Sequence, residues 1–237
     1  MVQEVERYRK PTRILHWIHA GSFTLLFLTG LVLFIPQLGF LAEDSWTRVI
    51  HRIGAVVFIV APLIYIPLNW KSSWKGIKEA VNWGMDDIGW LMAAPSYYFL
   101  ADEEAMPPQG HMNTGQKLWW LMVIIFGLVF VFSGILMWAL KTVAPPALLQ
   151  WMVIFHDIAF IASGAMFFVH VYLSVIHPLM RPLRTGAWSS MARGKVSVHY
   201  AMSHHAKWYN TISKSKEMQA NDQRDRNQNS EKTEDAG

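Results

Sequence analysis

Four long apolar stretches, separated by polar or proline-containing segments, set the pattern of the chain. They run roughly over residues 14–35, 49–68, 117–140 and 148–176. An α-helix rises about 1.5 Å per residue, so about 20 apolar residues cross a hydrocarbon core about 30 Å thick. The pattern therefore predicts an all-α fold, a bundle of four transmembrane helices in a lipid bilayer.

The segments between and after these stretches are polar. Residues 69–116 form a long connection between the second and third helices, and the apolar part of residues 86–100 is too short to span. We expect that part to lie at the membrane interface. Beyond Pro178, which is expected to close the fourth helix, the chain is first basic and then polar and low in hydrophobicity, as in disordered segments. The expected parts are a membrane domain, a basic tail and a disordered C-terminus, over residues 1–180, 181–217 and 218–237.

Lysine and arginine flank the four stretches unevenly. The N-terminal segment, the 69–116 connection with Lys117 directly after it, and the tail contain all 21 of these residues except Arg48, Arg52 and Lys141. Because positively charged loops stay on the cytoplasmic side, this asymmetry predicts that both termini and the long connection are cytoplasmic. The basic residues flank membrane helices, so the net charge of +4 gives no reason to expect a nucleic-acid partner.

The composition limits the possible metal chemistry. Of the 237 residues, 52% are hydrophobic, 16% are charged and none is cysteine. The absence of cysteine excludes disulfides, cysteine-bound iron–sulfur clusters and covalent C-x-x-C-H haem attachment within this chain. Any metal centre must therefore rest on histidine, methionine or carboxylate side chains.

Histidines inside the apolar stretches are the candidate ligands. His156 and His170 are fourteen residues apart in the fourth stretch, which on a helix is a rise of about 21 Å and a rotation of only about 40°. With the predicted orientation, His51 lies at the outer depth of His156 and His16 at the inner depth of His170. A six-coordinate haem needs one axial ligand on each face, so the two pairs predict two haem b groups, one above the other.

Other interpretations of these residues stay open. A histidine in a membrane helix can also be a packed polar residue, and His19 and His177 are rivals for the inner site. The remaining histidines lie in polar segments and are expected to be solvated: His111, His199, His204 and His205. Five glycines in the stretches leave room either for macrocycles or for close helix packing: Gly30, Gly54, Gly127, Gly134 and Gly164.

Several segments together have a recognisable pattern. They are RILHW at 13–17, VIHRIGA at 49–55, NTGQK at 113–117, the spacing of His156 and His170, and GKVSVHYAMSHHAKWY at 194–209. The pattern resembles the cytochrome b subunit, gamma, of respiratory formate dehydrogenase. The wider family includes the cytochrome b subunits of nickel–iron hydrogenase and thiosulfate reductase.

The resemblance implies a di-haem b subunit of the bacterial cytoplasmic (inner) membrane. It passes electrons from the iron–sulfur beta subunit of a dehydrogenase, itself served by a catalytic alpha subunit, to menaquinone or ubiquinone. It implies His51 and His156 as ligands of the outer haem and His16 and His170 as ligands of the inner haem. The chain supplies the quinone site and not the dehydrogenase site, and the complex is expected to form a higher oligomer.

The resemblance also implies a quinone pocket on the cytoplasmic side, beside the inner haem. The matching residues are Asn113, Gly115 and Gln116, with His170 at the edge. The amides can donate hydrogen bonds to a quinone carbonyl, and glycine permits close approach. Alternatively, the segment is only a helix N-terminus with Asn113 or Thr114 as its cap.

Two other functions remain as alternatives. The same cytochrome can serve another oxidoreductase, such as a hydrogenase or a thiosulfate reductase. A haem-free membrane anchor that only tethers a soluble enzyme is the alternative of a different class, and the depth-matched histidines argue against it.

Overall fold

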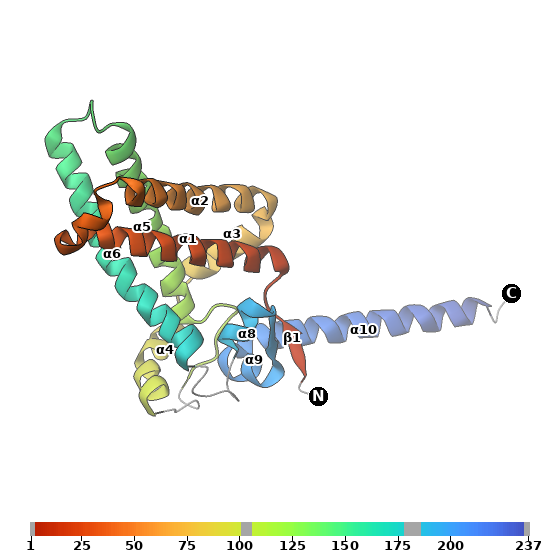
Figure 1. Cartoon of the computed structure of the whole chain (residues 1–237). Helices are drawn as coiled ribbons and strands as arrows, with labels where there is room; N and C mark the ends of the chain where they lie inside the picture. Colours follow the sequence, from red (N-terminus) through yellow and green to blue (C-terminus); the bar gives the residue numbers. More distant parts are fainter. Residues whose placement is uncertain (1–2, 101–105, 178–185, 235–237) are drawn as a thin grey trace. The chain divides into compact units, whose positions relative to one another are not determined.

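The computed structural model describes residues 3–100, 106–177 and 186–234, and it divides into two compact units (Figure 1). One unit, called the membrane unit below, comprises Glu4–Asn82 and Gln116–Val196. The other, called the connector unit, comprises Met1–Gln3, Trp83–Gly115 and Ser197–Gly237. The expected domain bounds stay a prediction; in this division, Trp83–Gly115 of the connection between the second and third helices groups with the C-terminal part. Pro178 and the expected boundary at residue 180 lie outside the described residues.

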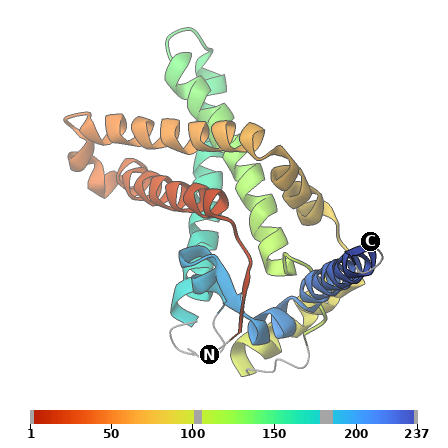
Figure 2. The ribbon, with the colours of Figure 1, turned by 90° about the vertical axis from the view of Figure 1, so that its right-hand side faces the viewer.

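The membrane unit contains the long helices that the hydrophobic pattern predicts. They are α1 (Lys10–Phe34), α2 (Trp46–Leu68), α5 (Thr114–Ala139) and α6 (Pro146–Val171), the last continued by the π-helical turn η3 (Tyr172–Ile176). All four are long and apolar enough to cross a membrane, which confirms the predicted all-α membrane fold. Figure 2 shows α1 and α2 side by side, joined through the short 3-10 segment η1 (Pro36–Ala42).

The outer surfaces of these helices suit a hydrocarbon environment. Large apolar side chains on all four helices are more than half exposed: Leu28, Ile53, Leu63, Leu128, Phe132 and Ile161. Burying such surfaces in lipid avoids exposing apolar area to water. Proline marks several helix starts, at Pro11 in the first turn of α1 and Pro146 in the first turn of α6. Proline suits these positions because its missing N–H would have no helical partner there.

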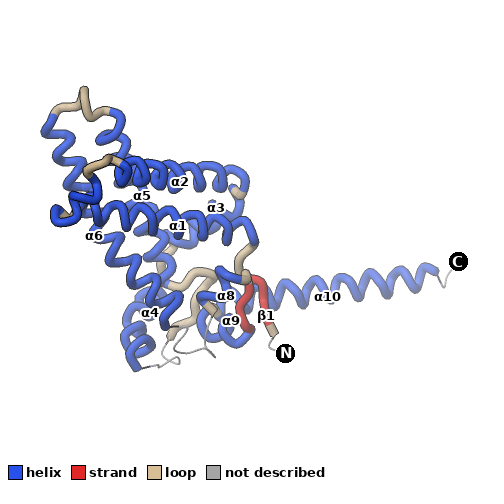
Figure 3. The backbone as a smooth tube through the Cα atoms, in the orientation of Figure 1, coloured by secondary structure: helices blue, strands red, loops and turns tan. Residues whose placement is uncertain are grey.

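A small two-stranded sheet joins distant parts of the chain. Strand β1 (Glu4–Glu6) pairs with β2 (Lys195–Ser197), which follows the short helix α8 (Ala187–Ala192) (Figure 3). The N–H groups of Arg7 and Tyr8 donate to the Gly194 carbonyl at 2.8 and 3.2 Å. Gly194 has a φ of +83°, and a Cβ there would lie 2.6 Å from the Tyr8 carbonyl oxygen. Only glycine therefore fits this position without strain.

The polar connection is helical over most of its length. In the membrane unit, α3 (Trp70–Val81) follows α2 directly. In the connector unit, α4 (Met85–Pro95) leads into the π-helical turn η2 (Ser96–Leu100). Four apolar side chains of α4 are exposed: Met85, Ile88, Leu91 and Met92. The interfacial position expected for this segment stays a prediction, and such a surface suits it.

The C-terminal part is more ordered than its composition indicates. After α9 (Val198–His204), one helix, α10 (Ala206–Glu234), runs through most of the segment that we expect to be disordered. This segment is polar, but it contains no proline or glycine before Gly237, and its glutamine, glutamate and arginine residues favour helix. Low hydrophobicity did not exclude a helix in this segment.

Candidate haem sites

The first histidine pair joins α2 to α6. The ring centroids of His51 and His156 are 6.4 Å apart, with an interplanar angle of 55°. The Thr29 hydroxyl of α1 donates to the Leu25 carbonyl at 2.7 Å and lies 2.8 Å from His51 Nδ1. Because the single hydroxyl hydrogen points to the carbonyl, His51 Nδ1 must be the donor in the second bond. That assignment leaves His51 Nε2 unprotonated, as a metal ligand requires.

His156 has the same arrangement with a different helix. Ser133 of α5, which is only 1% exposed, donates its hydroxyl hydrogen to the Val129 carbonyl at 2.6 Å. The same oxygen lies 2.8 Å from His156 Nδ1 and so accepts its hydrogen. A Cβ added at Gly134 would lie 3.8 Å from His156 Cε1, an ordinary contact. All four long helices therefore contribute to this pair, two through the histidines and two through the hydroxyls.

The second pair joins α1 to the C-terminal end of α6. The ring centroids of His16 and His170 are 6.3 Å apart, with an interplanar angle of 53°. Trp119 of α5 stacks on His170 at 4.3 Å and 11°, and Trp17 meets His16 edge-on at 5.1 Å. His16 Nδ1 is buried and has no hydrogen-bond partner among the described residues. Aromatic stacking thus takes the place that hydroxyls occupy in the first pair.

The spacing within both pairs fits a haem iron between the rings. An imidazole nitrogen lies about 1.1 Å from its ring centroid and binds a first-row metal at about 2.0 Å, so two axial imidazoles on one iron have centroids about 6.2 Å apart. The observed separations are 6.3 and 6.4 Å. Direct packing of the two rings would bring their centroids closer. Within the described residues no cluster of three or more His, Cys, Asp or Glu side chains suits a metal ion.

The rival histidines have other neighbours. His19 stacks on Phe58 of α2 at 4.7 Å and 18°. His177 lies with its ring 6.4 Å from that of Tyr172. The structure therefore brings together the predicted pairs, His16 with His170 and His51 with His156, in preference to pairs that include His19.

Aromatic side chains of α1 and α6 occupy the levels between the two pairs. The Phe27 ring lies 5.4 Å from that of Phe160 and 5.9 Å from that of Phe167. A Cβ at Gly164 would lie 2.7 Å from Phe27 Cε2, and a Cβ at Gly30 would lie 3.1 Å from Phe160. These glycines therefore serve aromatic packing between helices. A Cβ added at Gly54 would lie 3.3 Å from Leu26, which also indicates close helix packing, whereas a Cβ added at Gly127 would have no atom of the described residues within 4 Å.

The RILHW motif gains a structural explanation. The Arg13 guanidinium donates to the carbonyls of Met191, Ala192 and Arg193 at 3.1, 2.6 and 3.1 Å, and Trp17 Nε1 donates to Met191 at 3.2 Å. These carbonyls belong to the C-terminal end of α8, where helical partners are missing. Sequence reasoning found His16 but missed these roles of Arg13 and Trp17, whose signal was only their place in the motif.

The NTGQK segment contains both structural and candidate binding residues. In the connector unit, Thr114 is fully buried and donates its hydroxyl to Asp87 Oδ1 at 2.7 Å. A Cβ at Gly115 would lie 2.9 Å from the Trp90 ring, so packing alone accounts for this glycine. In the membrane unit, the Gln116 amide oxygen accepts from buried Arg7 at 3.1 Å. Thr114 begins α5 directly after Asn113, as the helix-start alternative expects.

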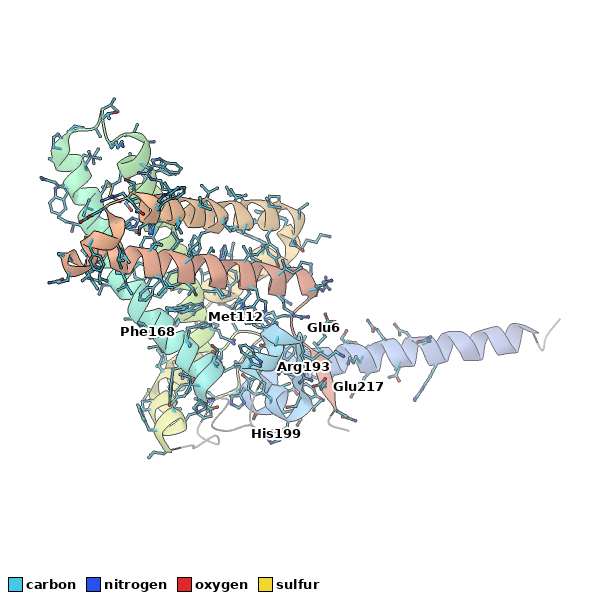
Figure 4. The ribbon with its side chains drawn as sticks, in the orientation of Figure 1. Glu6, Met112, Phe168, Arg193, His199 and Glu217 are labelled. Carbon is cyan, nitrogen blue, oxygen red and sulfur yellow. The ribbon has the colours of Figure 1, made fainter. Side chains whose placement is uncertain are left out.

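Two histidines of the C-terminal motif have hydrogen-bond partners in the protein, and one of them is buried. His205 is fully buried and donates from Nδ1 to the Gly110 carbonyl at 2.8 Å, and His204 Nε2 bonds the Tyr97 hydroxyl at 2.7 Å. The expectation for His205 is therefore wrong, because the polar segment around it folds against the 83–115 connection. His199, labelled in Figure 4, is exposed as expected. In the same unit, burial and then the neighbouring Tyr200 raise the pKa of Tyr98 to about 12.

Comparison with known proteins identifies a family. The sequence profile described as prokaryotic cytochrome b561 matches residues 7–194. The formate dehydrogenase cytochrome b556(fdo) subunit of Escherichia coli (strain K12) is 27% identical over 91% of this chain and 97% of that protein. The formate dehydrogenase cytochrome b556 subunit of Haemophilus influenzae is 26% identical over 92% and 88%. A probable Ni/Fe-hydrogenase B-type cytochrome subunit of Bradyrhizobium diazoefficiens is 26% identical over 79% and 84%.

Proposed function

Since the chain belongs to the prokaryotic cytochrome b561 family, we propose that this multi-pass membrane b-type cytochrome is a di-haem subunit that passes electrons from a dehydrogenase to quinone. The observation that supports two haems is the pair of histidine separations, 6.3 and 6.4 Å, at two levels along α6, which contributes one histidine to each pair. When bound, each haem b supplies a one-electron carrier. One would be held by His51 and His156, the other by His16 and His170.

The protein positions these ligands in two ways. Thr29 and Ser133 hold the Nδ1 hydrogens of His51 and His156, which fixes the tautomer and leaves Nε2 unprotonated, as an iron ligand requires. Trp119 holds the plane of the His170 ring by stacking. The Phe27 and Phe160 rings, 5.4 Å apart, lie on α1 and α6 between the levels of the two pairs.

The quinone site is proposed beside the His16–His170 pair. Gln116 lies one helical turn before Trp119 on the same face of α5, and Trp119 contacts His170. Arg7 binds the Gln116 amide oxygen and so orients the amide nitrogen, which can donate to a quinone carbonyl. Reduction of menaquinone or ubiquinone to the quinol takes two electrons and two protons. The roles of Asn113 and Gly115 in this site stay predictions from the family resemblance.

The partner is proposed from the names of the relatives and from chemistry. Cysteine is absent, so iron–sulfur clusters that deliver electrons must belong to another subunit. Formate dehydrogenase is the favoured source, because the Escherichia coli and Haemophilus influenzae relatives are its cytochrome subunits. Its iron–sulfur beta and catalytic alpha subunits would then be the partners, in a higher oligomer. The Bradyrhizobium relative supports a hydrogenase as the second candidate.

We further propose that the protein lies in the bacterial inner membrane with both termini in the cytoplasm. Electrons would enter at the outer pair, His51 and His156, and quinone would take its protons from the cytoplasm beside the inner pair. Each turnover would then move charge across the membrane without a conformational pump. A reconstituted complex that reduces quinone without generating a membrane potential would refute this part of the proposal.

Single-histidine variants in the assembled complex test the function directly. His51→Ala should remove one haem and stop quinone reduction by the dehydrogenase substrate, whereas His199→Ala, an exposed histidine, should leave haem content and rate unchanged. Haem is quantified by its absorption spectrum and quinone reduction by quinol formation. A His51→Ala complex that retains both haems would refute the ligand assignment. A wild-type complex without haem would identify the chain as a plain membrane anchor.

A further inference from the structure

The two histidine pairs differ in what holds their outward-facing nitrogens. In the His51–His156 pair, both Nδ1 atoms donate to a hydroxyl oxygen at 2.8 Å. Both hydroxyls, in turn, direct their own hydrogen to a backbone carbonyl of their helix, Thr29 to Leu25 and Ser133 to Val129. Each hydroxyl is therefore locked as an acceptor toward its imidazole.

The His16–His170 pair lacks this feature within the described residues. His16 Nδ1 is buried with no hydrogen-bond partner there, and no hydrogen bond to a ring nitrogen of His170 occurs in the same part of the chain. The His170 ring is held instead by parallel stacking on Trp119 at 4.3 Å. Stacking fixes the orientation of a ring but does not withdraw its Nδ1 hydrogen.

A hydrogen bond donated from Nδ1 makes Nε2 a more basic ligand. A more basic axial ligand stabilises oxidised iron over reduced iron, because the oxidised centre has one more positive charge. The donated bond is also stronger in the oxidised state, where it is closer to a charge-assisted hydrogen bond. Both effects lower the reduction potential of the metal that the ligand holds.

We propose that Thr29 and Ser133 are positioning residues that give the haem at His51–His156 a lower reduction potential than the haem at His16–His170. This inference rests on the proposed di-haem function. With haem bound at both pairs, one electron would pass from the centre at His51–His156 to the centre at His16–His170. The first iron would be oxidised and the second reduced. No proton accompanies this step, because each Nδ1 hydrogen stays on its imidazole and its hydroxyl partner. The external donor of the electron is the partner dehydrogenase.

The size of the effect follows from the difference between neutral and charge-assisted hydrogen bonds. That difference changes an equilibrium constant by about tenfold for one bond, which for a one-electron couple is about 59 mV. Removal of either hydroxyl should therefore raise the lower of the two potentials by about this amount. The upper potential, which belongs to His16–His170, should not move.

The test is an optical redox titration of the full-length haem-loaded complex with Thr29→Val and Ser133→Ala variants. Thr29→Ser keeps the hydroxyl and should titrate as wild type. Thr24→Val is the matched control, because within the described residues the Thr24 hydroxyl bonds only the Ala20 carbonyl of its own helix, at 2.7 Å. A His16→Ala complex, which retains only the other haem, assigns the lower step to its ligand pair.

The outcomes separate the inference from the function on which it rests. An upward shift of the lower step in Thr29→Val and Ser133→Ala, with Thr29→Ser and Thr24→Val unchanged, supports the inference. Where Thr29→Val loses haem, Ser133→Ala, the smaller change, decides. Three results would overturn the inference alone: neither reduction potential shifts, Thr29→Val and Thr29→Ser shift the potential equally, or only the upper potential shifts. A wild-type complex that binds fewer than two haems would overturn the proposed function as well.

Discussion

Arg13 is the side chain whose loss should most directly loosen the structure around His16. Its guanidinium makes three hydrogen bonds to carbonyls at the end of α8, at 3.1, 2.6 and 3.1 Å. It sits three residues before His16 on α1, almost one turn away. Arg13→Ala therefore removes the three guanidinium bonds to the end of α8, keeps the Trp17 bond to Met191, and loosens the first turn of α1.

The magnitude can be worked from these bonds. A hydrogen bond from a charged donor contributes about 1.5–3 kcal/mol, but one of the three is exposed and contributions within one group are not additive, so we expect a loss of about 3 kcal/mol. For a chain of this size, that corresponds to about 6–12 °C in the midpoint of thermal unfolding. Arg13→Lys, which keeps the charge but not the fork of donors, should lie between wild type and Arg13→Ala.

The assay is thermal release of haem from the purified complex, followed by absorption and compared with protein unfolding. Arg9→Ala is the matched control, because Arg9 is an exposed arginine in the same segment. Haem should leave Arg13→Ala at a lower temperature than Arg9→Ala, beginning with the His16–His170 site. Equal release temperatures for the two variants would refute the structural role of Arg13.

Three further substitutions have defined outcomes. Gly194→Ala should lower the amount of folded protein in membranes, because its Cβ would lie 2.6 Å from a backbone oxygen; expression at the wild-type level would contradict this. Gln116→Ala should slow quinone reduction without changing haem content. Gln150→Ala, which replaces an exposed glutamine, should change neither the rate nor the haem content; loss of haem in Gln116→Ala would show that Gln116 is structural. Gly164→Ala should destabilise the protein by about 1–3 kcal/mol, because the added Cβ would lie 2.7 Å from the Phe27 ring. Gly21→Ala should not, because a Cβ there has no atom of the described residues within 4 Å. Equal unfolding midpoints for the two variants would contradict this packing.

The hydrophobic pattern predicted the membrane helices well, because about 20 apolar residues have few alternatives to a membrane helix. The expected fourth helix covers residues 148–176, and the observed apolar helical span is Pro146–Ile176, so the two differ by two residues at one end. The histidine pairs were also predictable, since helix geometry and charge asymmetry together fix the relative depth of a side chain. Predicting which histidines pair requires little beyond the regular rise of a helix.

The other features of the site depend on contacts between different parts of the chain, which no local sequence pattern predicts. Thr29 and Ser133 become partners of histidines only through the relative rotation of neighbouring helices, which the spacing of apolar residues does not determine. Gly115 is explained by Trp90, which is distant in the sequence. His205 lies in a polar segment, and its burial follows from packing against residues about a hundred positions earlier. The sequence shows which residues precede and follow these positions, but not which residues lie next to them in the folded protein.

The haem content of the purified chain tests the central claim most directly. A pyridine haemochrome spectrum, taken against an independent protein concentration, gives the type and number of haems for each chain. The two histidine pairs, with ring separations of 6.3 and 6.4 Å, predict two haem b groups. One haem would show that a pair is misassigned, and none in a folded protein would contradict the account.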